Sequence, residues 1–155
     1  MSERQGWQGA LRAGLYSGTL ASVASALVLV WRGRRDARDP WAPLNGPSQW
    51  WFGRSAPHAR GFTVKHTVVG YLTHHFAATF WALLFESVPP RTRHPVAAAV
   101  GTAAVANVVD YVFTPKRLQP GYERQLSKRS LALAYGAFAL GLAASTLHRG
   151  QTPDR

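Results

Sequence analysis

The stretch between Lys65 and Glu86 constrains the fold of this chain most strongly. It contains 20 residues without a formal charge when histidine is neutral, which is about the length of one membrane-spanning helix. On a helical wheel its large apolar residues fall on one side and its polar and small residues on the other. The second group comprises His66, Gly70, Thr73, His74, Ala77 and Trp81. The stretch therefore predicts a transmembrane helix that turns an apolar face to lipid and a polar face to the protein.

Three further charge-poor segments predict membrane spans at about 13–31, 95–114 and 130–148, beside the span at 65–86. A cleaved signal peptide is the alternative for the first segment, because Ala24-Ser25-Ala26 resembles a cleavage site. The apolar run continues past that site and an arginine cluster follows, so a retained helix is the better interpretation. We expect an all-α fold, an integral membrane four-helix bundle formed by the 155 residues as a single domain.

Small residues recur every four positions in the first and fourth spans. This spacing lets two helix backbones approach closely in lipid, so we expect these residues to form packing faces. They are Gly14, Gly18 and Ser22 in the first span and Ala137, Gly141 and Ser145 in the fourth.

The connection between the first two spans contains a tryptophan-rich segment at about 40–53. Tryptophan prefers the headgroup region, where its ring is half buried and its N–H stays hydrated. We therefore expect a segment that lies along the membrane surface, with Trp41, Trp50 and Trp51 as interfacial anchors. A cation-binding aromatic box is the sharper but less favoured interpretation.

The net charge of +11 is carried mainly by arginine in the connecting segments. No groove-reading or base-stacking motif accompanies this charge, so nucleic acid is not an expected partner. Anionic lipid headgroups beside the spans explain it better. The first and third connections hold 12 Lys and Arg residues, and the rest of the chain holds 6. Positive charge stays on the cytoplasmic side, which predicts that both termini face the periplasm.

Polar residues at matching depths in the second and third spans predict an intramembrane cluster. Asp110 lies roughly 6 Å and His74 roughly 14 Å from the cytoplasmic ends of their helices. A short turn joins these helices, so we expect them to pack antiparallel. The Asp110 carboxylate then needs a hydrogen-bond donor, for which Tyr71, His66 and His74 are the candidates. The predicted cluster is His66, Tyr71, His74, Asn107 and Asp110.

Three interpretations of this cluster compete. The favoured one is structural, since polar groups that bind one another fix the register of helices in lipid. The second is a solute site or proton pathway that uses Asp110 and the intramembrane histidines. The third is a haem or metal site with His66, His74 or His75 as ligand. His75 lies at the border of the lipid face, where it either hydrogen-bonds a neighbouring helix or another subunit or is a tolerated polar residue, and the second interpretation is the favoured one.

Enzymatic chemistry is not expected. The sequence has no HExxH motif, nucleophile elbow or paired carboxylates. The absence of cysteine excludes disulfides, thiolate metal sites and covalent haem attachment through CxxCH. We expect no cofactor and no dedicated metal site. A structural or accessory role in the membrane fits best, as a homo-oligomer or within a larger membrane complex.

Three stretches together resemble uncharacterised small multi-spanning inner-membrane proteins of bacteria. They are AP-x-N followed by a tryptophan pair, HTVVGYLTHHFAATFWALLFE, and VVDYVFTPKRLQPGYE. The resemblance implies a multipass setting in the bacterial inner membrane. It implies no activity, cofactor or catalytic residue.

Overall fold

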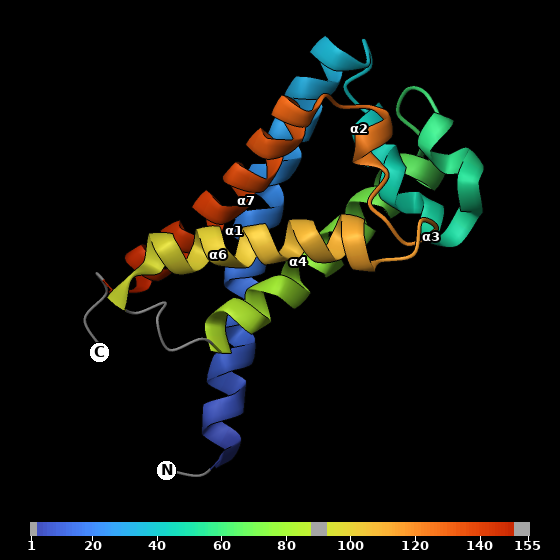
Figure 1. The fold of residues 1–155 in the computed structure, drawn as a ribbon. Coiled ribbons are helices and arrows are strands. Elements are labelled where there is room, and N and C mark those ends of the chain that lie inside the picture. Colours follow the sequence, from blue (N-terminus) through green and yellow to red (C-terminus); the bar gives the residue numbers. More distant parts are fainter. Residues whose placement is uncertain (1–2, 88–92, 151–155) are drawn as a thin grey trace.

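The computed structural model describes residues 3–87 and 93–150, and within these ranges the chain is helical and contains no strand (Figure 1). The all-α prediction is confirmed. Four helices are long and apolar enough to cross a membrane. The long helices are α1 (Glu3–Asp36), α4 (Val69–Ser87), α6 (Pro95–Val108) and α7 (Lys128–Gly150). Two π-helical turns extend them: η3 (Val64–Val68) leads into α4 and η4 (Val109–Phe113) continues α6.

Helix α1 is the centre of the bundle, because both α4 and α7 pack along it. Helix α6 lies against α7 and contacts α4 only lightly (Figure 1). The expectation that the second and third spans pack antiparallel is met only in part: α4 and α6 run in opposite directions (Figure 1) and touch lightly, but the main partner of α6 is α7. Alanines of α6 and α7 allow that close approach, among them Ala103 and Ala139.

Small residues lie where the backbones come closest. A Cβ added to Gly18 would lie 2.7 Å from the Thr79 Cα of α4, and one added to Gly141 would lie 2.5 Å from the Ala21 Cα of α1. A Cβ added to Gly14 would instead meet first the flexible end of the Leu83 side chain. Buried hydroxyls contribute as well, since the Ser145 hydroxyl donates to the Ser17 Oγ at 2.8 Å. Ser22 is also buried, whereas Ala137 is only half-buried.

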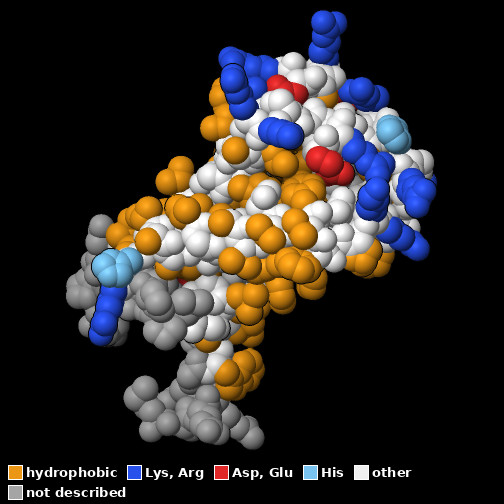
Figure 2. Space-filling view, in the orientation of Figure 1, with side chains coloured by type: hydrophobic (Ala, Val, Ile, Leu, Met, Phe, Trp, Pro, Cys, Tyr) orange, Lys and Arg blue, Asp and Glu red, His pale blue; other side chains and the backbone are white. Residues whose placement is uncertain are grey.

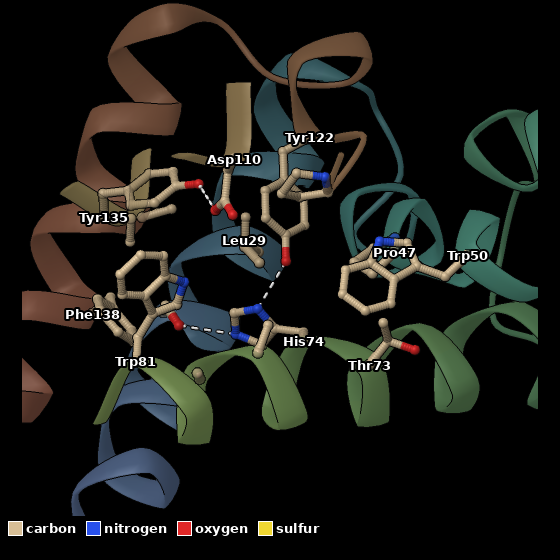
Figure 3. A pocket seen from close by; sticks show the side chains of 16 residues that line it. Leu29, Pro47, Trp50, Thr73, His74, Trp81, Asp110, Tyr122, Tyr135 and Phe138 are labelled. Carbon is tan, nitrogen blue, oxygen red and sulfur yellow. Dashed lines mark hydrogen bonds between the residues drawn. The ribbon is translucent and has the colours of Figure 1, made fainter. Parts of the chain in front are cut away.

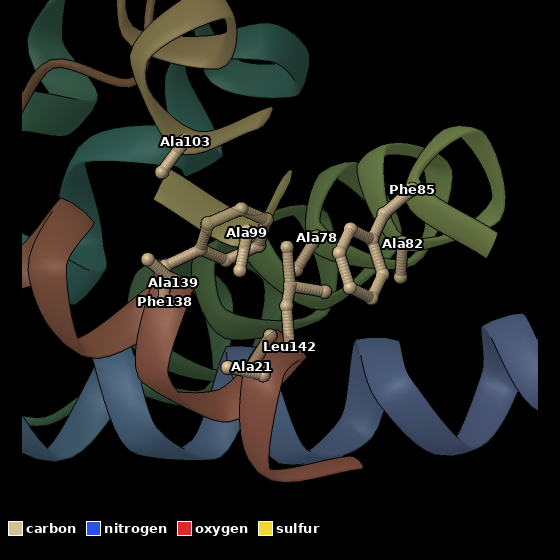
Figure 4. Close-up of a cluster of buried hydrophobic side chains, with 10 residues drawn as sticks. Ala21, Ala78, Ala82, Phe85, Ala99, Ala103, Phe138, Ala139 and Leu142 are labelled. Carbon is tan, nitrogen blue, oxygen red and sulfur yellow. The ribbon is translucent and has the colours of Figure 1, made fainter. Parts of the chain in front are cut away.

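A core of alanines around three large side chains joins the four long helices (Figure 4). Phe85 and Leu142 are fully enclosed and Phe138 nearly so. The other members are alanines contributed by α1, α4, α6 and α7. These are Ala21, Ala78, Ala82, Ala99, Ala103, Ala139 and Ala143.

The connection between α1 and α4 folds into short helices: α2 (Ala42–Asn45), η1 (Gly46–Ser48), α3 (Gln49–Phe52) and η2 (Gly53–His58). Every residue of 42–49 is buried. The Asn45 amide nitrogen donates to the carbonyls of Ala59 and Gly61 at 3.0 and 3.1 Å, and its oxygen accepts from the Thr67 hydroxyl at 2.6 Å. Protein therefore encloses residues 42–49, and the position of segment 40–53 along the membrane surface stays a prediction.

Among the three predicted anchors, Trp51 is 67% exposed, whereas Trp41 and Trp50 are half-buried. The Trp51 indole N–H donates to the Thr73 hydroxyl of α4 at 3.0 Å. The Trp41 ring meets Phe62 edge-on, with 5.3 Å between the ring centroids. Protein contacts therefore hold part of this segment, and lipid anchoring remains a prediction for its exposed surface.

Polar networks tie α1 to its neighbours at both ends. Near the end of α1, Asp36 accepts from the Ser130 hydroxyl at 2.5 Å and pairs with Arg32 at 3.0 Å. Towards its beginning, the buried Glu86 carboxylate accepts hydrogen bonds from Ser17 and Arg149. These pairings make α1 antiparallel to both α4 and α7. Lys and Arg side chains gather at the end of the molecule that carries α2 and α3, while apolar side chains cover the helices (Figure 2).

Candidate functional site

A cavity of about 70 Å³ lies inside the bundle, between the four long helices and the two folded connections (Figure 3). It combines one carboxylate with hydroxyl, imidazole and aromatic side chains. The lining residues are Ser25, Leu29, Pro47, Trp50, Thr73, His74, Ala77, Ala78, Trp81, Ala106, Asp110, Pro120, Tyr122, Ala134, Tyr135 and Phe138. The cavity joins segments far apart in sequence, so its composition depends on the tertiary fold.

Asp110 lies in the π-helical turn η4 and lines the cavity. Such turns widen a helix locally and recur at functional sites. Its Oδ2 accepts a hydrogen bond from the Tyr135 hydroxyl of α7 at 2.5 Å. The donor is therefore Tyr135 and not Tyr71, His66 or His74, because α6 packs on α7. Within residues 3–87 and 93–150, no cationic side chain forms an ion pair with Asp110.

The hydrogen bonds of His74 define its tautomer. The Ser25 hydroxyl donates to the Ala21 carbonyl at 2.8 Å, so it accepts from the His74 Nε2–H at 3.0 Å. The same N–H also faces the Ser22 carbonyl at 3.2 Å. The other ring nitrogen, Nδ1, accepts a hydrogen bond from the Tyr122 hydroxyl at 2.8 Å. His74 is thus a neutral imidazole with both nitrogens engaged by protein.

Tyr122 reaches the cavity from the connection between α6 and α7, in the short helix η5 (Tyr122–Arg124). Gly121 precedes it with φ of 80°, a left-handed conformation that glycine adopts without strain. Burial, with the nearby Tyr111 and Asp110, raises the pKa of the Tyr122 phenol well above its usual value. The phenol therefore stays protonated and donates to His74. The sequence offered only the Pro120-Gly121 turn as a signal for this placement.

Aromatic side chains form the rest of the wall. Figure 3 shows Trp81 and Phe138 on one side of the cavity and Trp50 on the other. Trp81 comes from α4, whereas Trp50 comes from α3 in the first connection. Trp50 therefore faces a cavity inside the protein in addition to its predicted place near the membrane surface.

The predicted cluster is divided among several places, and only His74 and Asp110 line the same cavity. His66 Nδ1 lies 3.1 Å from the Ser48 hydroxyl, at the packed first connection. Tyr71 contacts the ring of His74, with 6.3 Å between centroids, but does not line the cavity. Asn107 lines a separate groove between α6 and α7.

His75 points to α1, where its Nδ1 lies 2.7 Å from the Ser22 hydroxyl. The interpretation of His75 as a merely tolerated polar residue is therefore wrong, because it binds a neighbouring helix. Within residues 3–87 and 93–150, no group of three histidine, aspartate or glutamate side chains converges as a metal site would require.

No protein-family model, curated protein or solved structure matches this chain. The geometry of its own residues is therefore the basis for any functional assignment.

Proposed function

We propose that this chain is a non-enzymatic, four-span component of the bacterial inner membrane that binds a small solute in the cavity between its helices. The observation that carries this proposal is the cavity itself. It places the Asp110 carboxylate beside aromatic walls, and no cation of the described ranges pairs with that carboxylate. A carboxylate within a span is costly to insert, so its retention favours a functional role.

Insertion in a membrane is supported by the four apolar helices and by their exposed side chains. Large apolar side chains are exposed on three of the long helices: Leu27 of α1, Phe76 of α4 and Leu140 of α7 are each at least 66% exposed. An apolar surface of this kind suits lipid better than water. The arginine-rich end seen in Figure 2 is suited to anionic lipid headgroups.

Both termini are expected to face the periplasm, because the first and third connections carry 12 of the 18 Lys and Arg residues. Alkaline phosphatase fused after His148 should be active, and a fluorescent protein fused there should be dark. The same pair of reporters inserted between Arg54 and Ser55 should give the opposite readings. An active phosphatase at the internal site would contradict this orientation.

The size of the cavity limits the solute. Its volume of about 70 Å³ exceeds the about 10–15 Å³ that one water molecule needs. Drug-sized ligands occupy sites of about 300–1,000 Å³, so the volume favours a solute of a few heavy atoms over haem or another large cofactor. The hydrogen bonds at both nitrogens of His74 also argue against a metal ligand there.

The proposal predicts that filling the cavity abolishes solute binding. Ala77 lines the cavity from α4 and is half-buried. In Ala77→Leu the larger side chain should occupy the space, and solutes should no longer raise the Tm. The measurement is thermal unfolding in mild detergent with a panel of neutral, anionic and cationic solutes of up to a few heavy atoms.

The matched control is Ala97→Leu, at an exposed position of α6 outside the cavity lining. It should respond to the same solutes as the wild type. An equal Tm shift in Ala77→Leu, or no shift with any solute, would contradict binding in this cavity.

A further inference from the structure

The geometry points to a ligand class: a small monovalent organic cation of the ammonium type, held by the Asp110 carboxylate against the aromatic walls. This inference rests on the proposed function and specifies its solute. Asp110 provides the charge, while Trp50, Trp81 and Phe138 provide the aromatic faces.

The first argument is charge. Asp110 is half-buried in η4, within a segment apolar enough to span a membrane. Its only hydrogen bond among the described residues comes from Tyr135 at 2.5 Å. A carboxylate offers about four acceptor positions and a single neutral donor fills one. A bound cation would supply the missing charge and further donors, and would offset the cost of holding a carboxylate in an apolar segment.

The second argument is that the neighbouring polar side chains are already engaged. Thr73 donates to the Val69 carbonyl at 2.8 Å and accepts from Trp51 at 3.0 Å. His74 is saturated by Ser25 and Tyr122 at 3.0 and 2.8 Å. Among the hydroxyl, imidazole and carboxylate groups of the lining, Asp110 therefore retains the largest unused capacity. The free lone pairs of its carboxylate accept hydrogen bonds and favour a ligand with several donors.

The third argument separates an ammonium from a metal ion. Hard metal cations take six or more oxygen ligands, including several carboxylates or carbonyls. The cavity offers one carboxylate, from Asp110, and walls made largely of apolar and aromatic side chains. Aromatic faces attract organic cations through the ring quadrupole. Trp81 and Trp50 lie on opposite sides of the cavity (Figure 3), so an ammonium beside Asp110 would have aromatic surface on either side.

The fourth argument is size. A volume of about 70 Å³ lies well below the about 300–1,000 Å³ of sites that take drug-sized ligands, which favours an ammonium ion or methylammonium, each of one or two heavy atoms. Bulkier quaternary ammonium ions should bind more weakly in so small a volume. The cavity therefore predicts selectivity by size as well as by charge.

The test uses the full chain in mild detergent and three probes: methylammonium, the neutral and similarly sized methanol, and the larger tetramethylammonium. Calorimetry and ¹³C-methyl NMR measure binding. The wild type should bind methylammonium, with magnetisation transfer from its methyl group to indole protons of Trp50 or Trp81. Methanol and tetramethylammonium should bind at least about tenfold more weakly, because methanol lacks the positive charge and tetramethylammonium is larger and has no N–H donor.

The variants are Asp110→Asn, which keeps the size and a hydrogen-bond acceptor, and the control Glu123→Gln, which removes an exposed carboxylate outside the cavity. Asp110→Asn should lose at least about tenfold in methylammonium affinity, whereas Glu123→Gln should bind as the wild type does. A purely structural Asp110 would predict unchanged affinity in both.

Equal binding of methanol and methylammonium, or full affinity in Asp110→Asn, would overturn the cation inference. If methanol or another neutral solute binds and Ala77→Leu abolishes that binding, the proposed function stands without its cationic ligand. If no probe binds the wild type and no solute of the wider panel does, both fail. If Asp110→Asn does not fold, the binding of the three probes to the wild type still tests whether the cavity prefers a small cation.

Discussion

Gly70→Ala is expected to cause the largest loss of stability of any single added methyl group in this protein. A Cβ at position 70 would collide with the Leu44 carbonyl oxygen and lie 3.1 Å from the carbon of that carbonyl. Both colliding partners belong to backbone, so no rotamer change relieves the contact. The alanine must push α2 away from α4, which disturbs the buried segment 42–49. We expect a cost of about 3 kcal/mol, at the top of the 1–3 kcal/mol that overpacking typically costs, because both colliding groups belong to backbone.

The control is Gly101→Ala in α6, because no atom lies within 4 Å of a Cβ added there. Alanine has the higher helix propensity, so this variant should keep or raise stability, by up to about 1 kcal/mol. Thermal unfolding of both variants in the same mild detergent measures the difference. Equal Tm values for Gly70→Ala and Gly101→Ala would show that the Leu44 contact does not constrain the fold.

Gly141→Leu is the second large effect. The added side chain would start 2.5 Å from the Ala21 Cα and 2.7 Å from its nitrogen, so α1 and α7 would have to separate along their contact. The same substitution at Gly136, also in α7, meets no atom within 4 Å at the Cβ and should cost far less. Leu140→Ala removes a side chain that is 69% exposed and should change the Tm little.

Detergent unfolding of Gly141→Leu, Gly136→Leu and Leu140→Ala side by side makes the comparison. Similar losses of Tm at positions 136 and 141 would show that small residues in α7 reflect composition and do not define a packing face. A selective loss at Gly141 would identify the α1–α7 contact as the one that requires glycine.

The spans could be predicted from sequence because charges are so strongly segregated along it. The stretch from Lys65 to Glu86 matches the described apolar helix Val64–Ser87 closely. The predicted bounds of the first span, 13–31, are less accurate, because α1 runs over Glu3–Asp36 and extends past them at both ends. A helix can continue beyond its apolar part when its polar turns contact protein, as Asp36 does with Ser130.

Partners could not be predicted in the same way. The sequence predicts that Asp110 lies inside a span, but the hydrogen-bond donor to its carboxylate depends on which helix packs against α6. Which helices pack together depends on the shapes of their surfaces more than on their order in the sequence. Tyr135 offered no polar neighbours in its own helix to mark it. The hydrogen-bond partners of Asn45 could not be predicted either. Its side chain makes three hydrogen bonds that hold the first connection together, whereas an asparagine before a glycine predicts only a turn.

Because α1 carries the contact surfaces for both α4 and α7, a helix that is synthesised before both of them is also their template. Helices in lipid insert individually and associate afterwards. The Gly18 surface can pack as soon as α4 has been synthesised, whereas the Ala21 surface must wait for Gly141 of α7, which is synthesised later. Assembly should therefore proceed through an intermediate made of α1 and α4. In it, the α1 surface around Ala21 remains uncovered until α7 packs on it.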